Sequence, residues 1–386
     1  MKIQLSPTSI ELILSAAQYT DRKAGAAQSG LNPIYAHILL DLKPNGFLSV
    51  SSVNDGRFHS GVCRVEGDFE AGVAAIKADK FASLLECLPS GSSSSLAVSD
   101  TSAQLTCGRS RYKLSVVDPS AFPRMPKMES GCTEIDLPSG LLQQGLERVM
   151  KSMANNDARP FLEAVCIEVK QGEVTFVATD GHRLSLESFP YVTAITENTQ
   201  VLIPRKRVAD LLMVLRKSNT PVRFSFNAQA ARVYSTDLKW IFQFSLVDMR
   251  YPDYNRVIPN TTTMPVLKLD RYEFISALER ISHIANKSQS PSISNKSHSP
   301  SCVIHADGSD IRISAKGESE DTGEEQVSNR NNVVGVTSSF NINYLLDALR
   351  KLDDGVVDLC MSGTTPCHLS GESQKRAFHV VMPVRM

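Results

Sequence analysis

The sequence predicts an α+β protein made of three copies of one domain, each with antiparallel sheets and two helices. A helix-like stretch with a double leucine occurs three times, at steps of 127 and 134 residues, as Leu84-Leu85, Leu211-Leu212 and Leu345-Leu346. A second leucine recurs at a step of 132 residues, as Leu14, Leu146 and Leu278. An aromatic residue or Met precedes a proline at the end of each third, at Phe122, Tyr251 and Met382. Landmarks that share one period indicate triplication.

Two helices are expected in each third. The first of each pair is predicted near Thr8–Tyr19, Ser139–Ser152 and Arg271–Ala285. The second is the double-leucine segment. Its apolar residues are spaced i, i+3, i+4 and i+7, as in Phe81, Leu84, Leu85 and Leu88, and this spacing gives one buried stripe on a helix.

The other segments alternate between apolar and polar residues, which is typical of strands. The predicted strands include Glu163–Val169, Val174–Ala178, Val222–Phe226, Arg232–Tyr234, Trp240–Leu246, Val356–Met361 and Ala377–Met382. Proline-containing linkers at 123–132 and 259–265 separate the thirds. We therefore expect domains at residues 1–127, 133–257 and 265–386.

Composition indicates a globular cytoplasmic protein. Hydrophobic residues make up 42% of the chain and charged residues 21%, while the formal net charge is zero. A surface that binds anions would therefore need charge to be segregated. No segment has the length and apolarity of a membrane span or signal peptide. The eight cysteines contain no Cys-x-x-Cys pair, so we expect reduced thiols, no metal site and no cofactor.

The most conspicuous short motif is Val177-Ala-Thr-Asp180-Gly-His182-Arg-Leu184. An enzymatic interpretation takes Asp180 and His182 as the acid/base pair of a hydrolase. A structural interpretation takes Asp-Gly as a turn between two strands. The first third has a related turn, Asp55-Gly56-Arg57, without the histidine. A turn that recurs without its histidine favours the structural interpretation.

Basic residues gather on the double-leucine helices, at Arg205–Arg207, Arg216-Lys217, Lys77, Lys80 and Arg350-Lys351. A single cluster of this kind is usually a solvated helix face. Repetition on equivalent helices favours a positive surface that contacts phosphates without reading bases. The Ser/Asn/Lys/Pro-rich segment 286–301 has little to bury and is expected to be a loop.

Several motifs resemble the beta sliding clamp of bacterial DNA polymerase III, in family order from about residue 105 to the C-terminus. They are Gly108–Tyr112, Met153–Arg159, Ala178–Leu184, Leu202–Lys206, Val247–Val257 and Val380–Met386. The resemblance implies a non-catalytic processivity factor, a homodimeric ring with sheets outside and helices lining a hole around duplex DNA of any sequence. Its implied partners are the DNA polymerase III catalytic subunit, a clamp loader and other proteins with clamp-binding motifs, with no membrane partner.

The resemblance also assigns residues to sites. The peptide-binding pocket would comprise Leu162, Thr179, Gly181, His182, Arg183, Leu184, Pro252, Arg256, Val257, Val380, Met382, Pro383, Val384 and Arg385. DNA contacts would come from Arg22, Lys23, Lys80, Asn156, Phe161, Arg205 and Lys206. The dimer contact would join Tyr112 and Leu114 to His283 and Ile284.

Three departures from the family pattern concern DNA and dimer contacts. Asp79 stands where relatives carry a basic residue, Pro160 replaces one of two aromatic residues, and His283 replaces an aliphatic one. A divergent or accessory clamp therefore fits as well as a housekeeping clamp. The alternatives are a paralogue that binds partner peptides without encircling DNA and, in a different class, the hydrolase that uses Asp180 and His182.

Overall fold

The computed structural model describes residues 1–21, 23–24, 30–89, 91–128, 131–192, 195, 198–285, 300–317 and 320–384. The chain forms two compact units. The first unit comprises residues 1–142 and 209–246, and the second comprises residues 143–208 and 247–386. Nearly all of the predicted loop at 286–301 lies outside the described residues.

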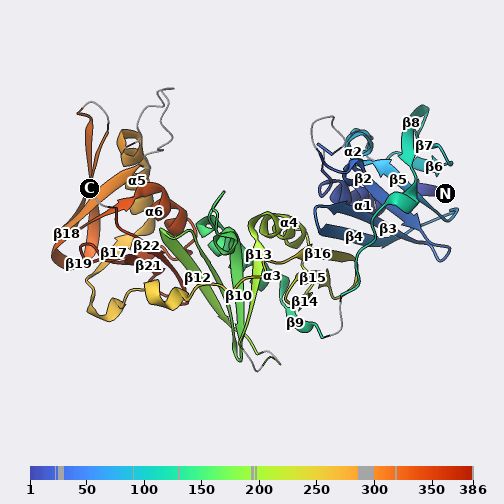
Figure 1. Ribbon diagram of the computed structural model, residues 1–386. Helices are drawn as coiled ribbons and strands as arrows, with labels where there is room; N and C mark the ends of the chain where they lie inside the picture. The colour runs from blue at the N-terminus through green and yellow to red at the C-terminus, as the bar shows by residue number, and fades with distance from the viewer. Residues whose placement is uncertain are drawn as a thin grey trace. The chain divides into compact units, whose positions relative to one another are not determined.

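The first unit is built on a twelve-stranded antiparallel sheet (Figure 1). Its strand order is β1-β6-β7-β8-β5-β2-β3-β4-β16-β15-β14-β9. The strands are β1 (Lys2–Leu5), β2 (His37–Leu42), β3 (Phe47–Asn54), β4 (Arg57–Arg64), β5 (Gly72–Lys77), β6 (Ser94–Val98), β7 (Ser102–Cys107), β8 (Ser110–Val117), β9 (Thr133–Leu137), β14 (Val222–Phe226), β15 (Ala230–Ser235) and β16 (Trp240–Ser245).

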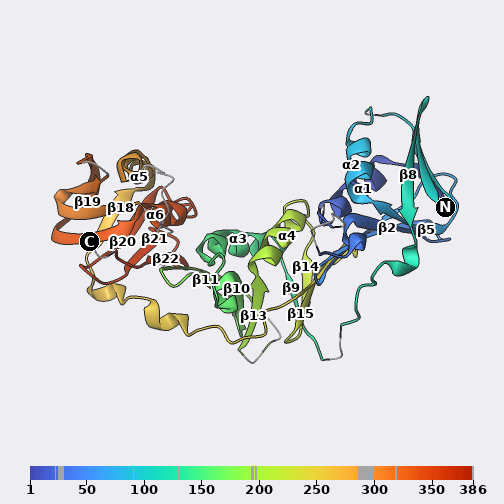
Figure 2. The same cartoon turned by 45° about the horizontal axis from the view of Figure 1, so that its top comes forward.

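Helices α1 (Pro7–Ala17) and α2 (Ala78–Glu86) lie side by side against this sheet (Figure 2). Helix α1 begins after Ser6, whose Oγ accepts a hydrogen bond from the Ser9 amide at 3.2 Å. The predicted apolar stripe of α2 faces inward, because Phe81 and Leu85 are buried in the core that α1 and the sheet share. The apolar periodicity thus explains how the helix packs.

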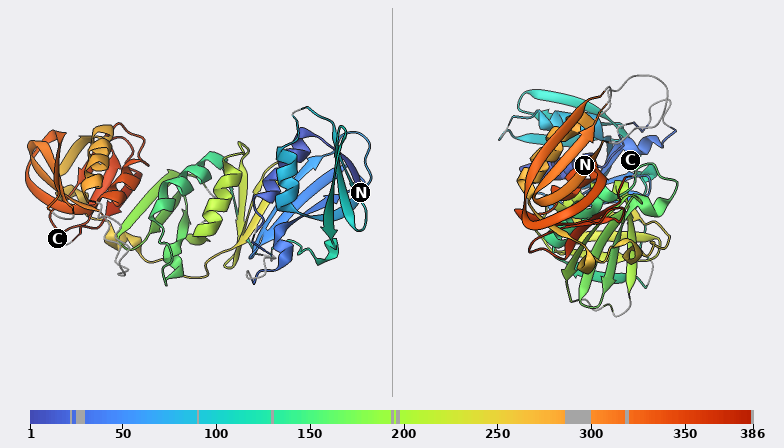
Figure 3. Two further views of the ribbon diagram at one scale, coloured as in Figure 1. Left: turned by 90° about the horizontal axis from the view of Figure 1, so that it is seen from above. Right: turned by 90° about the vertical axis from the view of Figure 1, so that its left-hand side faces the viewer.

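The second unit is built on a ten-stranded antiparallel sheet in the order β13-β10-β11-β12-β22-β21-β20-β17-β19-β18. Its strands are β10 (Ala164–Lys170), β11 (Glu173–Thr179), β12 (Arg183–Pro190), β13 (Thr199–Pro204), β17 (Val266–Asp270), β18 (Ser301–Lys316), β19 (Thr322–Asn341), β20 (Val356–Cys360), β21 (Cys367–Gly371) and β22 (Ala377–Val381). The views from above and from the side show β18 and β19 curving together as one long hairpin (Figure 3).

The remaining helices confirm the predicted pairs. Helices α5 (Arg271–Ala285) and α6 (Ile342–Leu349) pack together in the second unit, where Asn341 Oδ1 caps α6 through the Asn343 amide at 2.9 Å. Helices α3 (Ser139–Val149) and α4 (Arg205–Leu215) have residues in both units. Short 3-10 helices are η1 (Pro33–Ala36), η2 (Pro119–Ala121), η3 (Met150–Ser152), η4 (Pro160–Glu163), η5 (Tyr254–Val257) and η6 (Thr261–Thr263).

The order of elements recurs along the chain. A strand, a helix, four strands, a helix and three strands occur from β1 to β8 and again from β9 to β16. We call each copy of this order a round. The third round, from β17 to β22, has the two long strands β18 and β19 in place of the four strands between its helices. The predicted ranges 1–127, 133–257 and 265–386 each contain one round. As domain boundaries they stay a prediction.

Two junctions join successive rounds edge to edge within the sheets. In the first unit β4 pairs with β16, with Arg57 opposite Phe244 and Gly61 opposite Trp240. In the second unit β12 pairs with β22, with Arg183 opposite Val381. In both cases the strand after the Asp-Gly turn pairs with the last strand of the next round. Backbone hydrogen bonds therefore seal each junction.

Buried polar groups stabilise both junctions. In the first, His59 stacks on Tyr19 with ring centroids 4.5 Å apart, and Arg57 forms an ion pair with Asp210. In the second, Ser185 Oγ lies 2.6 Å from Nδ1 of His379. Burial of a charged ring without a partner is unfavourable. Both histidines are therefore neutral in the folded protein.

The buried histidines predict that the fold loses stability in acid. Burial, and then Arg57 and Lys217, lower the pKa of His59 to about 3 from an ordinary value of 6.5. Between these pH values the unfolded chain binds a proton that the folded chain excludes. Stability is therefore full above pH 6.5 and falls with decreasing pH, by about 1.4 kcal/mol per pH unit for each such histidine.

Urea unfolding between pH 7.5 and 5 measures this loss. His59→Phe removes the titrating imidazole and should therefore flatten the pH dependence. The substitution keeps the aromatic stacking on Tyr19, and it breaks no hydrogen bond of Nδ1, which has no partner among the described residues. The substitution His182→Gln, at an exposed side chain, is the control. An equal slope for wild type and His59→Phe contradicts the prediction.

Candidate functional site

A pocket of about 310 Å³ lies in the second unit. Its size is that of a small ligand or peptide-anchor site. It is lined by Arg159, Phe161, Leu162, Thr179, Gly181, Arg183, Leu184, Pro252, Asp253, Tyr254, Val257, Val380 and Met382. These residues come from η4, the β11–β12 turn, η5 with the residues before it, and the end of β22.

The floor of the pocket is apolar, and apolar side chains at its opening are exposed to solvent. Leu162, Leu184 and Val380 are almost completely buried beneath it. Met382 and Val257 remain 38% and 43% exposed. Exposed apolar side chains beside a buried apolar floor indicate a surface that a partner covers.

Nine of the fourteen predicted pocket residues line this pocket: Leu162, Thr179, Gly181, Arg183, Leu184, Pro252, Val257, Val380 and Met382. His182, Arg256, Pro383 and Val384 lie outside its lining, and Arg385 lies outside the described residues. The structure adds Arg159, Phe161, Asp253 and Tyr254. Each added residue is within three positions of a predicted one. The added residues lie in or directly before the 3-10 helices η4 and η5, and sequence reasoning did not predict these two turns.

The carboxylate of Asp180 organises the turn between β11 and β12. Its Oδ1 accepts hydrogen bonds from the amides of His182 at 2.9 Å and Arg183 at 3.0 Å. Thr179 Oγ1 donates to the Arg183 carbonyl at 2.6 Å and accepts from the Gly181 amide at 3.1 Å. Asp180 therefore performs the structural role of a turn cap, and the hydrolase interpretation is not favoured.

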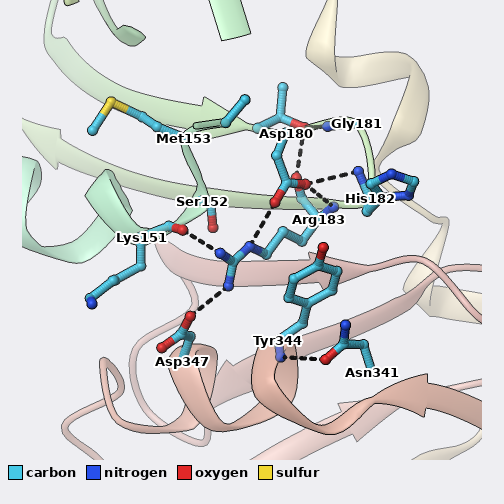
Figure 4. Close-up of polar contacts among 12 residues, drawn as sticks. Lys151, Ser152, Met153, Asp180, Gly181, His182, Arg183, Asn341, Tyr344 and Asp347 are labelled. Atoms are coloured by element: carbon cyan, nitrogen blue, oxygen red, sulfur yellow. Dashed lines mark hydrogen bonds and ion pairs between the residues drawn. The ribbon is translucent and has the colours of Figure 1, made fainter. Parts of the chain in front are cut away.

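Arg183 connects this turn to the third round (Figure 4). Its Nε donates to Asp180 Oδ2 at 3.0 Å, and its terminal nitrogens donate to Asp347 Oδ2 at 2.7 Å and to the Lys151 carbonyl. The guanidinium also lies 4.3 Å from the ring centroid of Tyr344. Arg183, one of the predicted pocket residues, is thus held by four groups.

Charged residues border the pocket on two sides. Arg159 makes a bidentate contact with Asp157, with both distances 2.9 Å, and Arg256 Nε donates to Asp253 Oδ2 at 3.0 Å. Hydrogen bonds from Arg159 lower the pKa of Asp157 to about 2. These exposed pairs orient side chains and contribute little to stability.

A buried carboxylate supports the pocket from below. Tyr254 donates its hydroxyl hydrogen to Glu168 Oε2 at 2.6 Å, and Asn198 and Gln200 each donate to Oε1 at 3.1 Å. Burial raises the pKa of Glu168, but these hydrogen bonds and Lys170 outweigh burial and bring it below its ordinary value. The ionised Glu168 therefore fixes Tyr254 in the pocket wall.

The residues predicted to contact DNA differ in exposure and in their local contacts. Lys23, Lys80, Asn156 and Lys206 are exposed, whereas Phe161 is half-buried and lines the pocket. Arg205 donates to the carbonyls of Met153 at 2.8 Å and Ala154 at 3.2 Å. A guanidinium held in this way has fewer donors for a phosphate. Arg22 lies outside the described residues.

The described part of the chain lacks both a metal-binding cluster and a membrane-spanning helix. Its residues contain no group of three His, Cys, Asp or Glu side chains placed to hold a metal ion. None of its helices is long and apolar enough to cross a membrane.

Comparison with known proteins shows the family to which this chain is related. Residues 136–253 match the central domain of the DNA polymerase III beta subunit, and residues 255–385 match its C-terminal domain. The beta sliding clamp of Vibrio cholerae is 28% identical over 92% of this chain and 93% of the relative. That of Escherichia coli K12 is 26% identical over 92% and 93%.

Solved structures agree with the sequence comparison. The Pseudomonas aeruginosa DnaN sliding clamp bound to griselimycin has a TM-score of 0.90 at 23% identity over 100% of both chains. The fold is therefore that of the DNA sliding clamps. The chain belongs to the DNA polymerase III beta subunit family. Its function is that of a processivity factor with no catalytic activity of its own.

Proposed function

We propose that two copies of this chain close head to tail into a ring around duplex DNA, and that the pocket of the second unit holds peptides from DNA polymerase III and other partners. The observation that carries the ring is a pair of free sheet edges. The pocket is supported by its apolar floor and exposed Met382. A ring tethers DNA topologically, so it needs neither net positive charge nor base contacts.

The free edges repeat the pairing found at both junctions. Within the described strands, residues 110–115 of β8 pair only with β7, and residues 322–328 of β19 pair only with β18. Strand β8 is the last of its round, like β16 and β22. The start of β19 follows a turn, like β4 and β12. Pairing of these edges between two copies reproduces the junction and covers both edges.

Two of the predicted dimer residues lie on the β8 edge, and the other two lie at the end of helix α5. Tyr112 and Leu114 are on β8, with Tyr112 38% exposed. His283 is exposed at the end of α5, and Ile284 lies against the β18–β19 hairpin, because a Cβ added to Gly323 would come within 3.1 Å of its Cγ1. Their roles in dimerisation are part of the proposal.

DNA contact is assigned to the exposed cations of the helices and nearby segments. Lys80 and Lys206 occupy the first turns of α2 and α4, and Lys23 follows α1. Asn156 adopts a left-handed backbone conformation with φ of 59°. Lysines contact phosphates without reading sequence, so duplex DNA of any sequence would fit.

The pocket would be shared by several partners. The catalytic subunit of DNA polymerase III, the clamp loader and other clamp-binding proteins would each insert a short segment with apolar anchors. The clamps of Pseudomonas aeruginosa and Bartonella birtlesii bind griselimycin. We expect griselimycin to occupy this pocket and to compete with those peptides.

Loading on DNA tests the ring. The clamp is loaded onto nicked circular DNA with a clamp loader, the salt concentration is raised, and the DNA is then linearised. We expect protein to remain on the circle at high salt and to leave after linearisation, because a ring slides off ends. If the protein instead leaves both circular and linear DNA as the salt concentration rises, it binds DNA electrostatically and not as a ring.

The alternative of a paralogue that sequesters partner peptides without encircling DNA is not favoured, because proteins named beta sliding clamps match over 92% of the chain. Asp79 neighbours Lys80 and lies 3.8 Å from Lys77, which reduces the positive charge of α2. A sequestering paralogue would bind griselimycin yet never load onto the circle.

A further inference from the structure

The β18–β19 hairpin joins the rest of its sheet through a single paired position (Figure 1). Strand β19 is the neighbour of β17, and within the described strands the only residues that these two strands pair are Leu269 and Asn329. On its other side β17 pairs with β20 along its whole length, from Val266 to Asp270. A junction with so few backbone hydrogen bonds needs other contacts to fix its geometry.

The side chain of Asn329 supplies such contacts. Asn329 is only 6% exposed. Its Oδ1 accepts hydrogen bonds from the amides of Lys268 and Asn331, each at 3.1 Å. Its Nδ2 donates to the Gly308 carbonyl at 3.1 Å and to the Asn331 carbonyl. A primary amide can accept two hydrogen bonds and donate two, so this buried side chain is fully satisfied. One side chain thus ties β17, β18 and β19 together.

The hairpin is irregular beside this residue. Its pairing register shifts twice between Ala306 and Asp310, and Gly308 has a left-handed backbone with φ of 77°. Regular pairing then resumes with Asp310 opposite Ser328. Such irregularities re-aim a strand. Asn329 therefore lies between the base of the hairpin and its outer part, where the direction of the outer part is set.

The edge of β19 changes its partner at Asn329. There β17 occupies the side of β19 that faces away from β18. The same side of residues 322–328 is free, and it forms the proposed dimer edge. A strand from a second copy cannot extend past Asn329, because β17 already fills that position. The register of an added strand depends on where the edge ends.

We propose that Asn329 is a positioning residue for the dimer, which holds residues 322–328 in one direction and marks the end of the edge that a second copy covers. This inference rests on the proposed pairing of the β8 and β19 edges. An edge that is already ordered loses less entropy when another strand pairs with it. The buried side chain acts through its own chain.

Two variants test this role. Asn329→Asp replaces the two donors of Nδ2 by an acceptor at nearly constant shape, and Asn329→Ala removes the whole amide. The matched control is Asn332→Asp, the same exchange at an exposed side chain of β19. Sedimentation equilibrium measures the dissociation constant of the dimer. We expect this constant to rise at least about tenfold in both test variants and to stay at the wild-type value in the control.

Hydrogen exchange distinguishes positioning from general destabilisation. At concentrations where every chain is monomeric, the amides of residues 322–328 should exchange faster in both test variants, while β10 and β11 exchange as in wild type. A wild-type dissociation constant in both variants overturns the inference, and so does faster exchange throughout the second unit. If wild type is monomeric at every concentration, the proposed ring fails, and exchange at residues 322–328 alone decides whether Asn329 fixes the edge.

Discussion

Met382→Ala lowers peptide affinity by at least about tenfold, and removal of residues 382–386 abolishes binding while the chain still dimerises. Met382 lines the pocket, is 38% exposed, and donates its amide hydrogen to the His182 carbonyl at 2.9 Å. Loss of its side chain opens the apolar floor to water, and removal of the whole residue also releases the amide contact with the turn. Fluorescence polarisation with labelled griselimycin measures affinity, and sedimentation measures the dimer.

Met249→Ala is the matched control, because Met249 is also an exposed methionine of the second unit, at 47%, and lies outside the pocket. It should bind griselimycin like wild type. If the truncated chain retains the wild-type affinity, the pocket is misassigned. If the truncated chain binds griselimycin poorly and is also monomeric, the tail acts on folding and not on the pocket.

Arg148→Ala lowers the free energy of unfolding by about 3–5 kcal/mol. Arg148 and Glu187 are 4% and 5% exposed, and the guanidinium donates to both Glu187 oxygens, at 3.1 and 3.3 Å, and to Asp353 at 2.7 Å. Removal of the arginine leaves a buried carboxylate with Gln144 as its remaining side-chain donor among the described contacts. Urea unfolding followed by circular dichroism measures the loss.

Two further variants identify the cause of that loss. Arg223→Ala breaks a pair with Asp136 in which the side chains are 41% and 55% exposed, and should cost at most about 1 kcal/mol. Combining Arg148→Leu with Glu187→Leu removes the buried, unpaired carboxylate and should restore much of the stability. Equal losses for Arg148→Ala and Arg223→Ala would show that burial does not set the cost.

The sequence predicted the helices for a physical reason, and it assigned the pocket residues through the family resemblance. The stripe of Phe81, Leu84 and Leu85 repeats with the period of a helix, so it specified a helix and its buried face. A local pattern of this kind can be interpreted without knowing the fold. Leu162, Leu184 and Val380 belong to compact family motifs, and each lies on the floor of the pocket.

Contacts between distant segments could not be predicted in the same way. The ion pair of Arg183 with Asp347 joins two segments that are far apart in the sequence. Nothing in the sequence around an arginine indicates which distant carboxylate it will contact. Phe161 illustrates a second difficulty. Its family position implied DNA contact, which stays a prediction, and the 3-10 turn η4 also places it in the pocket lining. Only the fold decides which neighbour a side chain meets.

The sealed junctions explain how much a clamp of this family can change. Where β4 meets β16 and β12 meets β22, the bonds that hold successive rounds together join main-chain amides and carbonyls, which every residue except proline supplies. Mutation can therefore replace the side chains on these strands without removing the backbone bonds that hold each junction. Relatives can diverge in surface charge and still keep the same strand pairing.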